Sequence, residues 1–258
     1  MKIAILSHWR TYSSLLARQF RLAGMRVENS FWVSQICDAN TELHALNHVG
    51  ERYWKGKMPF DEATRTIQNV LVRFKEEAER QNWEHYGFKV THAVFANTFN
   101  MFVDRILEFW GEDTAFITTM SDPATVCWNT RMYPEWTPER IYDCLAEAAP
   151  AVAWIQRRGH LIRTPEDWEN GHVEKVAEEL GLHWTDEIGS LYNQSLRPPD
   201  GYKEELEAKL PAATKERIAV YNEIFEIEDD LRAGNFKSGQ PQSVVVEENY
   251  DTTDDETI

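Results

Sequence analysis

Short apolar runs alternate along the chain with longer segments in which apolar residues recur at helical spacing. Four of these runs have the length and residue types of buried strands, namely 2–7, 87–91, 114–119 and 160–162. Strands that alternate with helices form a parallel sheet, because each helix returns the chain to the same end of the sheet. The pattern therefore predicts an α/β fold, with a central, mainly parallel sheet flanked by helices in three layers.

Capping residues, prolines and glycines mark the ends of the helical segments. Thr137-Pro138-Glu139 and Thr164-Pro165-Glu166 each combine a cap, a proline at the first helical position and an acid in the first turn. Gly111 and Gly181 each follow a helical segment. The predicted helices are 14–24, 61–81, 97–110, 137–158, 168–180, 204–210 and 212–231. Segment 25–32 is interpreted as a second strand or an irregular edge.

The end of the first strand carries the most distinctive chemistry. The apolar run K-I-A-I-L-S leads into a polar turn, H-W-R-T-Y-S-S, and a helical period begins at Leu15. The first backbone N–H groups of a helix lack partners and carry partial positive charge, so such a junction attracts anions. Arg10 adds a fixed cation, and Thr11, Ser13 and Ser14 add hydroxyl donors. The junction predicts a phosphate- or sulfate-type site, and the open alternative is an ordinary turn in which Ser and Thr cap the helix.

The junction lacks the glycines and the G-K-[ST] ending of the Walker loop. It resembles instead the opening of the sulfotransferases that use 3′-phosphoadenosine 5′-phosphosulfate (PAPS), a strand followed by R/K-S-G-T-T/S-L-L and a helix. On that pattern Arg10 takes the basic position, and Thr11, Ser13 and Ser14 take hydroxyl positions. Tyr12 stands where the family has glycine, and a tyrosine resists backbone geometry that glycine permits.

Further motifs follow in the order of that family. Y-G-F-K at 86–89 is similar to its W-G-x-K-D-P strand, and F-I-T-T-M-S-D-P at 116–123 is similar to its I-V-x-x-R-D-P strand. Segments 160–168 and 179–182 are similar to its last strand and its F-L-G-L helix end. The resemblance covers roughly residues 1–182 and rests on the order of motifs that are individually weak. It implies a P-loop-type, sulfotransferase-like fold that binds PAPS.

One segment departs from the family where the 3′-phosphate of the cofactor is held. Ser121 replaces the arginine of R-D-P, and Asn129 replaces the serine eight positions further on. Neutral hydrogen bonds would then replace charge-assisted ones, at a loss of ~1 kcal/mol or more per contact. Arg131 is a candidate to reach the same phosphate. The alternative interpretation of Ser121-Asp122-Pro123 is a helix cap followed by proline at the first helical position.

Sulfuryl transfer needs a base for the acceptor and a cation for the charge on the bridging oxygen. The resemblance implies Lys89 as the cation, and His92 is the candidate base, with His8 as the second choice. Residues three apart in an ideal strand point to opposite faces, so Lys89 and His92 converge only if the chain bends between them. His44 and His48 are spaced to share one face if their segment is helical, but they are not interpreted as a metal pair.

Composition narrows the function classes. A chain of 258 residues with 42% hydrophobic residues can bury a large core, and its net charge of −16 argues against a general nucleic-acid binder. Cys37, Cys127 and Cys144 lack C-x-x-C spacing, which favours the reducing cytoplasm over a disulfide framework or a zinc site. The N-terminal apolar run is shorter than a signal peptide requires, and no stretch approaches the length of a membrane span.

A single domain is expected over residues 1–237, followed by a disordered acidic tail over 238–258, which contains no Lys or Arg. Three functions fit this chain. The first is sulfuryl transfer from PAPS to an unidentified hydroxyl or amine on a small-molecule or carbohydrate acceptor. The second is nucleotide binding or phosphotransfer on the same fold, and the third is a noncatalytic interaction protein. The acceptor stays open, since its pocket would fall on loops 38–59 and 133–136, with Trp9 or Trp128 as a candidate wall.

Overall fold

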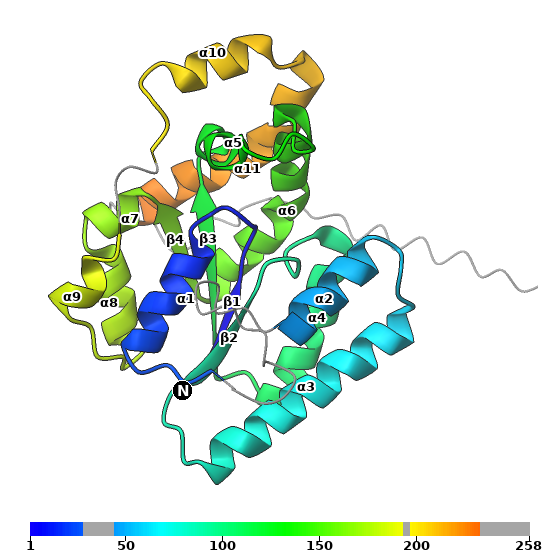
Figure 1. Ribbon diagram of the computed structural model, residues 1–258, viewed down its shortest axis with the longest axis vertical. Coiled ribbons are helices and arrows are strands. Elements are labelled where there is room, and N and C mark those ends of the chain that lie inside the picture. Colours follow the sequence, from blue (N-terminus) through cyan, green and yellow to red (C-terminus); the bar gives the residue numbers. More distant parts are fainter. Residues whose placement is uncertain (28–43, 193–196, 233–258) are drawn as a thin grey trace, which may run out of the picture.

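A parallel sheet forms the centre of the computed structural model, which describes residues 1–27, 44–192 and 197–232 (Figure 1). The sheet has four strands in the order β2-β1-β3-β4, and every pairing is parallel. The strands are β1 (Lys2–Leu6), β2 (Tyr86–Val90), β3 (Thr114–Ser121) and β4 (His160–Thr164). The α/β fold and the four strands predicted from the apolar runs are confirmed.

Helices cover the sheet, and most of them were predicted from the sequence. They are α1 (Ser13–Leu22), α2 (His44–Trp54), α3 (Phe60–Arg80), α4 (Ala96–Trp110), α5 (Pro123–Thr130), α6 (Pro138–Arg158), α7 (Glu166–Glu169), α8 (His172–Glu179), α9 (Asp186–Gly189), α10 (Tyr202–Lys209) and α11 (Ala212–Arg232). The predicted helix 168–180 is divided into α7 and α8, because Gly171 between them has a φ of 75°. Helix α2 was not predicted.

Both faces of the sheet are buried, which explains why its strands are almost continuously apolar. Ile3 and Ile5 of β1 point to one face, where they pack with α1 and α8. Ala4 and Leu6 point to the other face, where they pack with α3, α4 and α6. Figure 1 shows the same arrangement, with α1, α8 and α9 on one side of the sheet and α2, α3 and α4 on the other. The three layers follow from this two-sided burial.

A further apolar cluster lies beyond the end of β3. Helix α6 packs against α11, and Tyr142 and Leu145 belong to the same buried cluster as Ile218 and Tyr221. The Tyr221 hydroxyl donates a hydrogen bond of 3.2 Å to the carbonyl oxygen of Ser121, the last residue of β3. The C-terminal helix therefore belongs to the same packed unit as the sheet.

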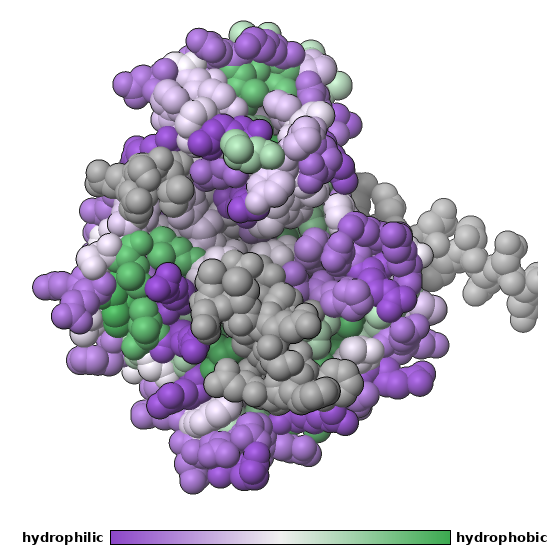
Figure 2. Space-filling view, viewed as in Figure 1, coloured by the Kyte–Doolittle hydropathy of each residue, from purple (hydrophilic) through white to green (hydrophobic). Residues whose placement is uncertain are grey.

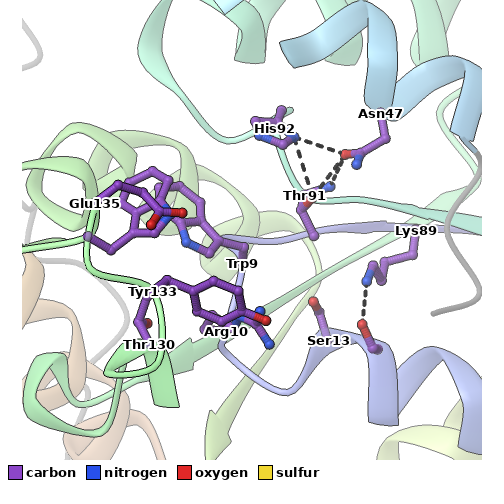
Figure 3. Close-up of a pocket in the computed structure, with 12 residues that line it drawn as sticks. Trp9, Arg10, Ser13, Asn47, Lys89, Thr91, His92, Thr130, Tyr133 and Glu135 are labelled. Carbon is purple, nitrogen blue, oxygen red and sulfur yellow. Dashed lines mark hydrogen bonds between the residues drawn. The ribbon is translucent and has the colours of Figure 1, made fainter. Parts of the chain in front are cut away.

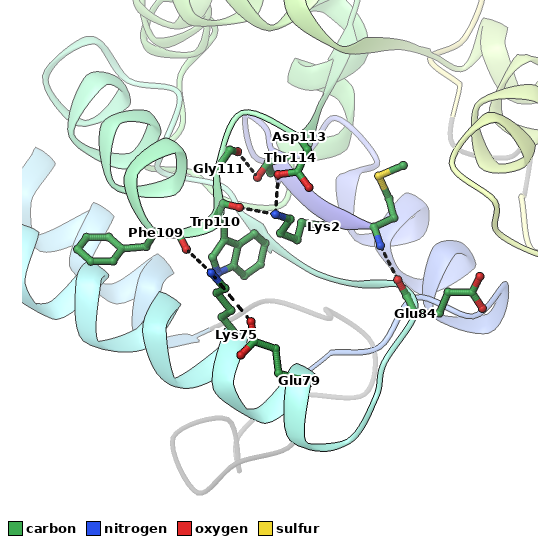
Figure 4. A network of polar contacts seen from close by, with 10 residues as sticks. Lys2, Lys75, Glu79, Glu84, Phe109, Trp110, Gly111, Asp113 and Thr114 are labelled. Atoms are coloured by element: carbon green, nitrogen blue, oxygen red, sulfur yellow. Dashed lines mark hydrogen bonds and ion pairs between the residues drawn. The ribbon is translucent and has the colours of Figure 1, made fainter.

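The opposite end of the sheet is held by charged contacts at the N-terminus (Figure 4). Lys2 Nζ donates to Asp113 Oδ1 at 2.5 Å and also to the carbonyl oxygen of Trp110, so β1 is tied to the turn before β3. Hydrophilic residues dominate the described surface on the face shown in Figure 2. None of the helices in the described ranges combines the length and apolar character that a bilayer crossing requires.

Some predictions fall at the edge of what the structure describes. Within the described part of segment 25–32, residues 25–27, Arg26 forms a single parallel bridge to Tyr86. Residues 28–32 of that segment, Cys37 and the predicted tail 238–258 lie outside the described residues. The tail therefore stays a prediction.

The strand order places a ligand crevice at the start of α1. From β1 the chain passes to β2 at one edge of the sheet, and from β3 it passes to β4 at the other edge. The order therefore reverses between β1 and β3, which are neighbours at the centre. In parallel sheets of this kind, ligands bind outside the carboxyl ends of the strands where the order reverses. The polar turn at 7–12 lies at this position.

Candidate functional site

A cavity of about 390 Å³ opens beside the polar turn at the carboxyl ends of β1 and β2 (Figure 3). Its walls come from the turn and the first residues of α1, the end of β2, helix α2 and the segment between α5 and α6. The lining residues are Trp9, Arg10, Ser13, Ser14, Asn47, Lys89, Thr91, His92, Thr130, Tyr133, Glu135 and Trp136. Five of the residues predicted for the site, Arg10, Ser13, Ser14, Lys89 and His92, therefore line one cavity.

The turn takes an unusual backbone path. Arg10 and Tyr12 both have a φ of 62°, in the left-handed region that costs an L-residue roughly 1–2 kcal/mol. Tyr12 is the residue before α1, and within the described part of the chain no side chain caps this helix. Ser13 and Ser14 are the first residues of α1, and the side-chain cap that the alternative interpretation expected is not seen at Tyr12. The left-handed Tyr12 adopts a conformation typical of glycine, the residue that stands at this position in the resembling family.

Buried hydroxyls fix this turn to the neighbouring strand. Thr11 Oγ1 donates to the carbonyl oxygen of His8 at 2.6 Å and lies 2.6 Å from Thr119 Oγ1 of β3. The backbone N–H of Thr119 in turn donates to Ser7 Oγ at 3.1 Å. Thr11 is fully buried and its side chain is not among those that line the cavity. Its hydroxyl supports the turn, and a ligand contact from Thr11 would have to come from its backbone.

Lys89 brings a buried positive charge to the first turn of α1. It is the fourth residue of β2, its exposed fraction is 1%, and Nζ donates to Ser14 Oγ at 2.7 Å. A charged group is rarely so buried unless a partner or ligand stabilises it. Arg10 is exposed at the opposite wall, with its guanidinium 4.7 Å from the centre of the Tyr133 ring. Two cations thus face the uncapped helix end, although the chain as a whole carries a net charge of −16.

His92 reaches the same cavity because β2 ends before it. The strand stops at Val90, and Thr91 and His92 lie in the bend that comes directly after it. The strict alternation of side chains in a strand therefore does not apply to these two residues. His92 Nδ1 lies 3.1 Å from Asn47 Oδ1 of α2, and Asn47 Oδ1 also accepts from the N–H and the hydroxyl of Thr91, at 3.0 and 2.9 Å. Figure 3 shows this three-residue contact across the cavity from Arg10. The convergence that a straight strand would forbid is therefore present.

His8, the second candidate base, is placed differently. Its exposed fraction is 1%, its Nδ1 contacts the carbonyl oxygen of Trp9 at 2.7 Å, and its ring stacks on Trp9 with 3.7 Å between centroids. Burial lowers the pKa of His8 to about 3, so the ring is neutral at ordinary pH. His8 is not one of the described residues that line the cavity. We interpret it as part of the packing beneath the turn.

Aromatic rings form the remaining wall of the cavity. Trp9 packs against Trp136 with 4.5 Å between ring centroids, and Glu135 and Tyr133 lie beside Trp136 on the same segment. Trp9 is thus placed as the predicted acceptor wall would require. Trp128 packs against Tyr202 outside this cavity.

A smaller cavity of about 230 Å³ continues the site on the other side of Arg10, Ser13 and Ser14, and it is also lined by Tyr12 and Asn129. Burial raises the pKa of Tyr12, so its phenol stays protonated. Asn129 lies beside the space into which a ligand bound at the start of α1 would extend. The two cavities share Arg10, Ser13 and Ser14, which leaves room for one elongated ligand or two adjacent ligands across the start of α1.

Ser121 and Arg131 lie away from both cavities. Ser121 is fully buried, and its hydroxyl contacts the hydroxyl of Thr164. Asp122 caps α5 by accepting from the N–H groups of Ala124 and Thr125, as the capping interpretation of this segment predicted. The Arg131 guanidinium stacks on Trp128 at 3.8 Å and donates to its carbonyl oxygen. Neither side chain is among those that line the two cavities within the described ranges.

Sequence reasoning missed Asn47, Thr91 and Glu135. Asn47 lies on the unpredicted helix α2, and its contact with His92 joins residues 45 positions apart, which no local pattern reveals.

The chain matches no protein-family model, no curated protein and no solved structure. The geometry and chemistry of the two cavities are therefore the basis of the functional assignment.

Proposed function

We propose that the chain is a nucleotide-dependent transferase that moves the sulfuryl group of PAPS to a hydroxyl or amine of a small-molecule or carbohydrate acceptor. The observation that carries the proposal is the buried Lys89 ammonium, held 2.7 Å from Ser14 Oγ at the uncapped start of α1, in a cavity that His92 also lines. A fixed cation, a helix N-terminus and a base within one cavity are what transfer of an anionic group requires.

The residues have distinct roles in this proposal. The backbone N–H groups at the start of α1, with Ser13 and Arg10, bind the anionic group that is transferred. Lys89 offsets the negative charge that develops on the bridging oxygen. His92 accepts the proton of the acceptor, which lies against Trp9 and Trp136. When bound, PAPS would supply only the activated sulfuryl group.

The fit to PAPS is incomplete at the 3′-phosphate. Asn129 lines the smaller cavity as a neutral donor, whereas the Ser121 hydroxyl is buried against Thr164. This favours, as a second candidate, a nucleotide that lacks the 3′-phosphate, with phosphoryl rather than sulfuryl transfer. A noncatalytic protein that retains the anion site is the third outcome that an experiment must separate.

Calorimetric titration of the full chain with adenosine 3′,5′-bisphosphate, AMP, ADP and ATP tests the proposal. Preferred binding of the 3′,5′-bisphosphate supports PAPS as the donor. Preferred binding of ATP or ADP supports the second candidate. Wild-type affinity for every nucleotide in both Arg10→Ala and Lys89→Met variants would contradict the site, and binding without turnover of any acceptor supports the noncatalytic protein.

The cytoplasm remains the expected compartment. Cys127 and Cys144 are both buried free thiols in the structure, and burial raises the pKa of each to about 12. Thiols in this state are unreactive core residues and are compatible with a reducing environment. Fractionation of the source cells with an antibody to the chain would test the location.

A further inference from the structure

A single oxygen of the Asn47 side chain makes three polar contacts. Asn47 Oδ1 lies 3.0 Å from the backbone nitrogen of Thr91, 2.9 Å from Thr91 Oγ1 and 3.1 Å from Nδ1 of His92. All three atoms belong to the two residues that follow β2. A contact of this density at the end of a strand fixes the direction of the side chains that leave it.

The backbone N–H of Thr91 determines which atom of the amide faces His92. An amide nitrogen in the main chain can only donate, so the Asn47 atom next to it must be the carbonyl oxygen and not the NH₂ group. The same oxygen faces His92 Nδ1, and an oxygen that accepts requires a proton on that nitrogen. The neutral ring then has Nδ1–H, and its lone pair is on Nε2.

The close approach of α2 to His92 depends on a glycine one helical turn from Asn47. A Cβ atom added to Gly50 would lie 3.4 Å from the Phe102 ring and 3.1 Å from His92 Cβ, and the second distance is shorter than most side-chain contacts. Leu46 and Val49 of α2 are buried in the same core. The helix is therefore seated directly against His92, and its position places the Asn47 amide.

We propose that Asn47 is the positioning residue for His92, holding the ring in the Nδ1–H tautomer so that Nε2 accepts the proton of the acceptor substrate. The catalytic meaning of this assignment rests on the proposed transferase function. Among the described residues, Glu51 on α2 and His8 beneath the turn also interact electrostatically with the ring. Glu51 pairs with Lys55 at 2.5 Å, and His8 is buried and neutral. His92 Nδ1 also lies 3.5 Å from Thr91 Oγ1, but that hydroxyl donates to Asn47 Oδ1, so the Asn47 oxygen at 3.1 Å is the nearer partner and the one that selects the tautomer.

Nitrogen-15 NMR of the full chain, labelled at its histidines, tests the tautomer without any substrate. The chain has eight histidines, and the His92→Asn variant identifies the signals of His92 by their loss. At about pH 8, above the ordinary titration range of histidine, the wild type is expected to show a protonated Nδ1 and an unprotonated Nε2 at His92. A protonated Nε2 in the wild type would overturn the proposal.

Two variants of Asn47 separate positioning from general structure. Asn47→Asp keeps an oxygen acceptor and is expected to keep the Nδ1–H tautomer, whereas Asn47→Leu removes the acceptor and is expected to populate both tautomers. Unchanged His92 signals in a folded Asn47→Leu variant would contradict the proposal. Because Asn47→Leu also leaves the Thr91 N–H without this acceptor, the wild-type and Asn47→Asp spectra keep the proposal testable if that variant does not fold.

Nucleotide binding and turnover distinguish this inference from the proposed function. Asn47→Leu is expected to lower kcat by about 10²–10⁴-fold, the effect of losing a positioned base, with no change in affinity for adenosine 3′,5′-bisphosphate. A loss of nucleotide affinity equal to the loss of turnover would assign Asn47 to binding and overturn its positioning role. If the tautomer is as expected and no tested nucleotide binds, the transferase function fails while the role of Asn47 in orienting His92 stands.

Discussion

Lys89 Nζ donates a hydrogen bond of 2.7 Å to Ser14 Oγ, and this contact joins β2 to the first turn of α1 across 75 positions of sequence. The ammonium is buried while the start of the helix carries its own partial positive charge. Two positive elements in contact repel each other unless an anion or another partner offsets them. The proposed function assigns this contact to one half of an anion site.

Replacing Lys89 by methionine should weaken nucleotide binding while it preserves the volume of the side chain. The expected loss of affinity for adenosine 3′,5′-bisphosphate is roughly 1.5–3 kcal/mol, the value of a hydrogen bond to a charged group, and titration calorimetry measures it. A thermal melt of the same variant should show no loss of Tm attributable to a cavity. Unaltered affinity in a folded Lys89→Met protein would remove Lys89 from the site.

Arg10 should contribute a similar amount from the exposed wall. Arg10→Ala is expected to weaken binding by roughly 1.5–3 kcal/mol, because a charge-assisted contact to the anion is lost. Arg131→Ala is the matched control, since Arg131 stacks on Trp128 away from both cavities and its loss should leave affinity unchanged. Equal effects of the two substitutions would point to long-range electrostatics in place of a site at Arg10.

His92→Asn should lower turnover by about 10²–10⁴-fold, the usual effect of removing a general base. Nucleotide affinity should stay close to that of the wild type, because His92 is expected to contact the acceptor and not the donor. Turnover is followed as the release of adenosine 3′,5′-bisphosphate from PAPS with a set of phenol, sugar and amine acceptors. Near-native turnover in this variant would transfer the search for a base to the carboxylate of Glu135, which lines the same cavity.

His8 should make stability depend on pH under acidic conditions. Burial lowers its pKa from an ordinary value of 6.5 to about 3, so between these values the unfolded chain binds a proton that the folded chain does not. The stability that a neutral His8 permits is therefore complete above about pH 6.5 and falls by up to ~1.4 kcal/mol per pH unit as the pH drops towards 3. Urea unfolding at several pH values measures this slope, which should be smaller in His8→Gln. Identical slopes would show that His8 does not titrate in this way.

The fold was largely predictable because its signals are local. Both faces of β1 are buried, so the strand is an uninterrupted apolar run, and the cap and proline at Thr137 and Pro138 mark the start of α6. Helix α2 was missed, and the predicted helix 168–180 was treated as continuous although Gly171 adopts a left-handed φ within it. Glycine within a helical pattern is compatible with either outcome, and tertiary packing decides between them.

The site was predictable only where one segment carries it. Arg10, Ser13 and Ser14 were predicted because the polar turn follows a strand directly, and Lys89 and His92 because they lie at the end of another strand; these five residues line the larger cavity. Asn47 could not be found, since its role depends on a contact between α2 and the end of β2. The burial of the Ser121 hydroxyl against Thr164 is likewise a property of two paired strands, β3 and β4, and not of either sequence alone.

The wall shared by the two cavities has a kinetic consequence. Arg10, Ser13 and Ser14 line both spaces, so a donor and an acceptor bound on either side would touch at the start of α1. Transfer would then be direct between the two substrates, without a stage at which the protein carries the group. Initial-rate plots at several fixed acceptor concentrations would intersect instead of running parallel, and the spent nucleotide would compete with the donor while leaving room for the acceptor.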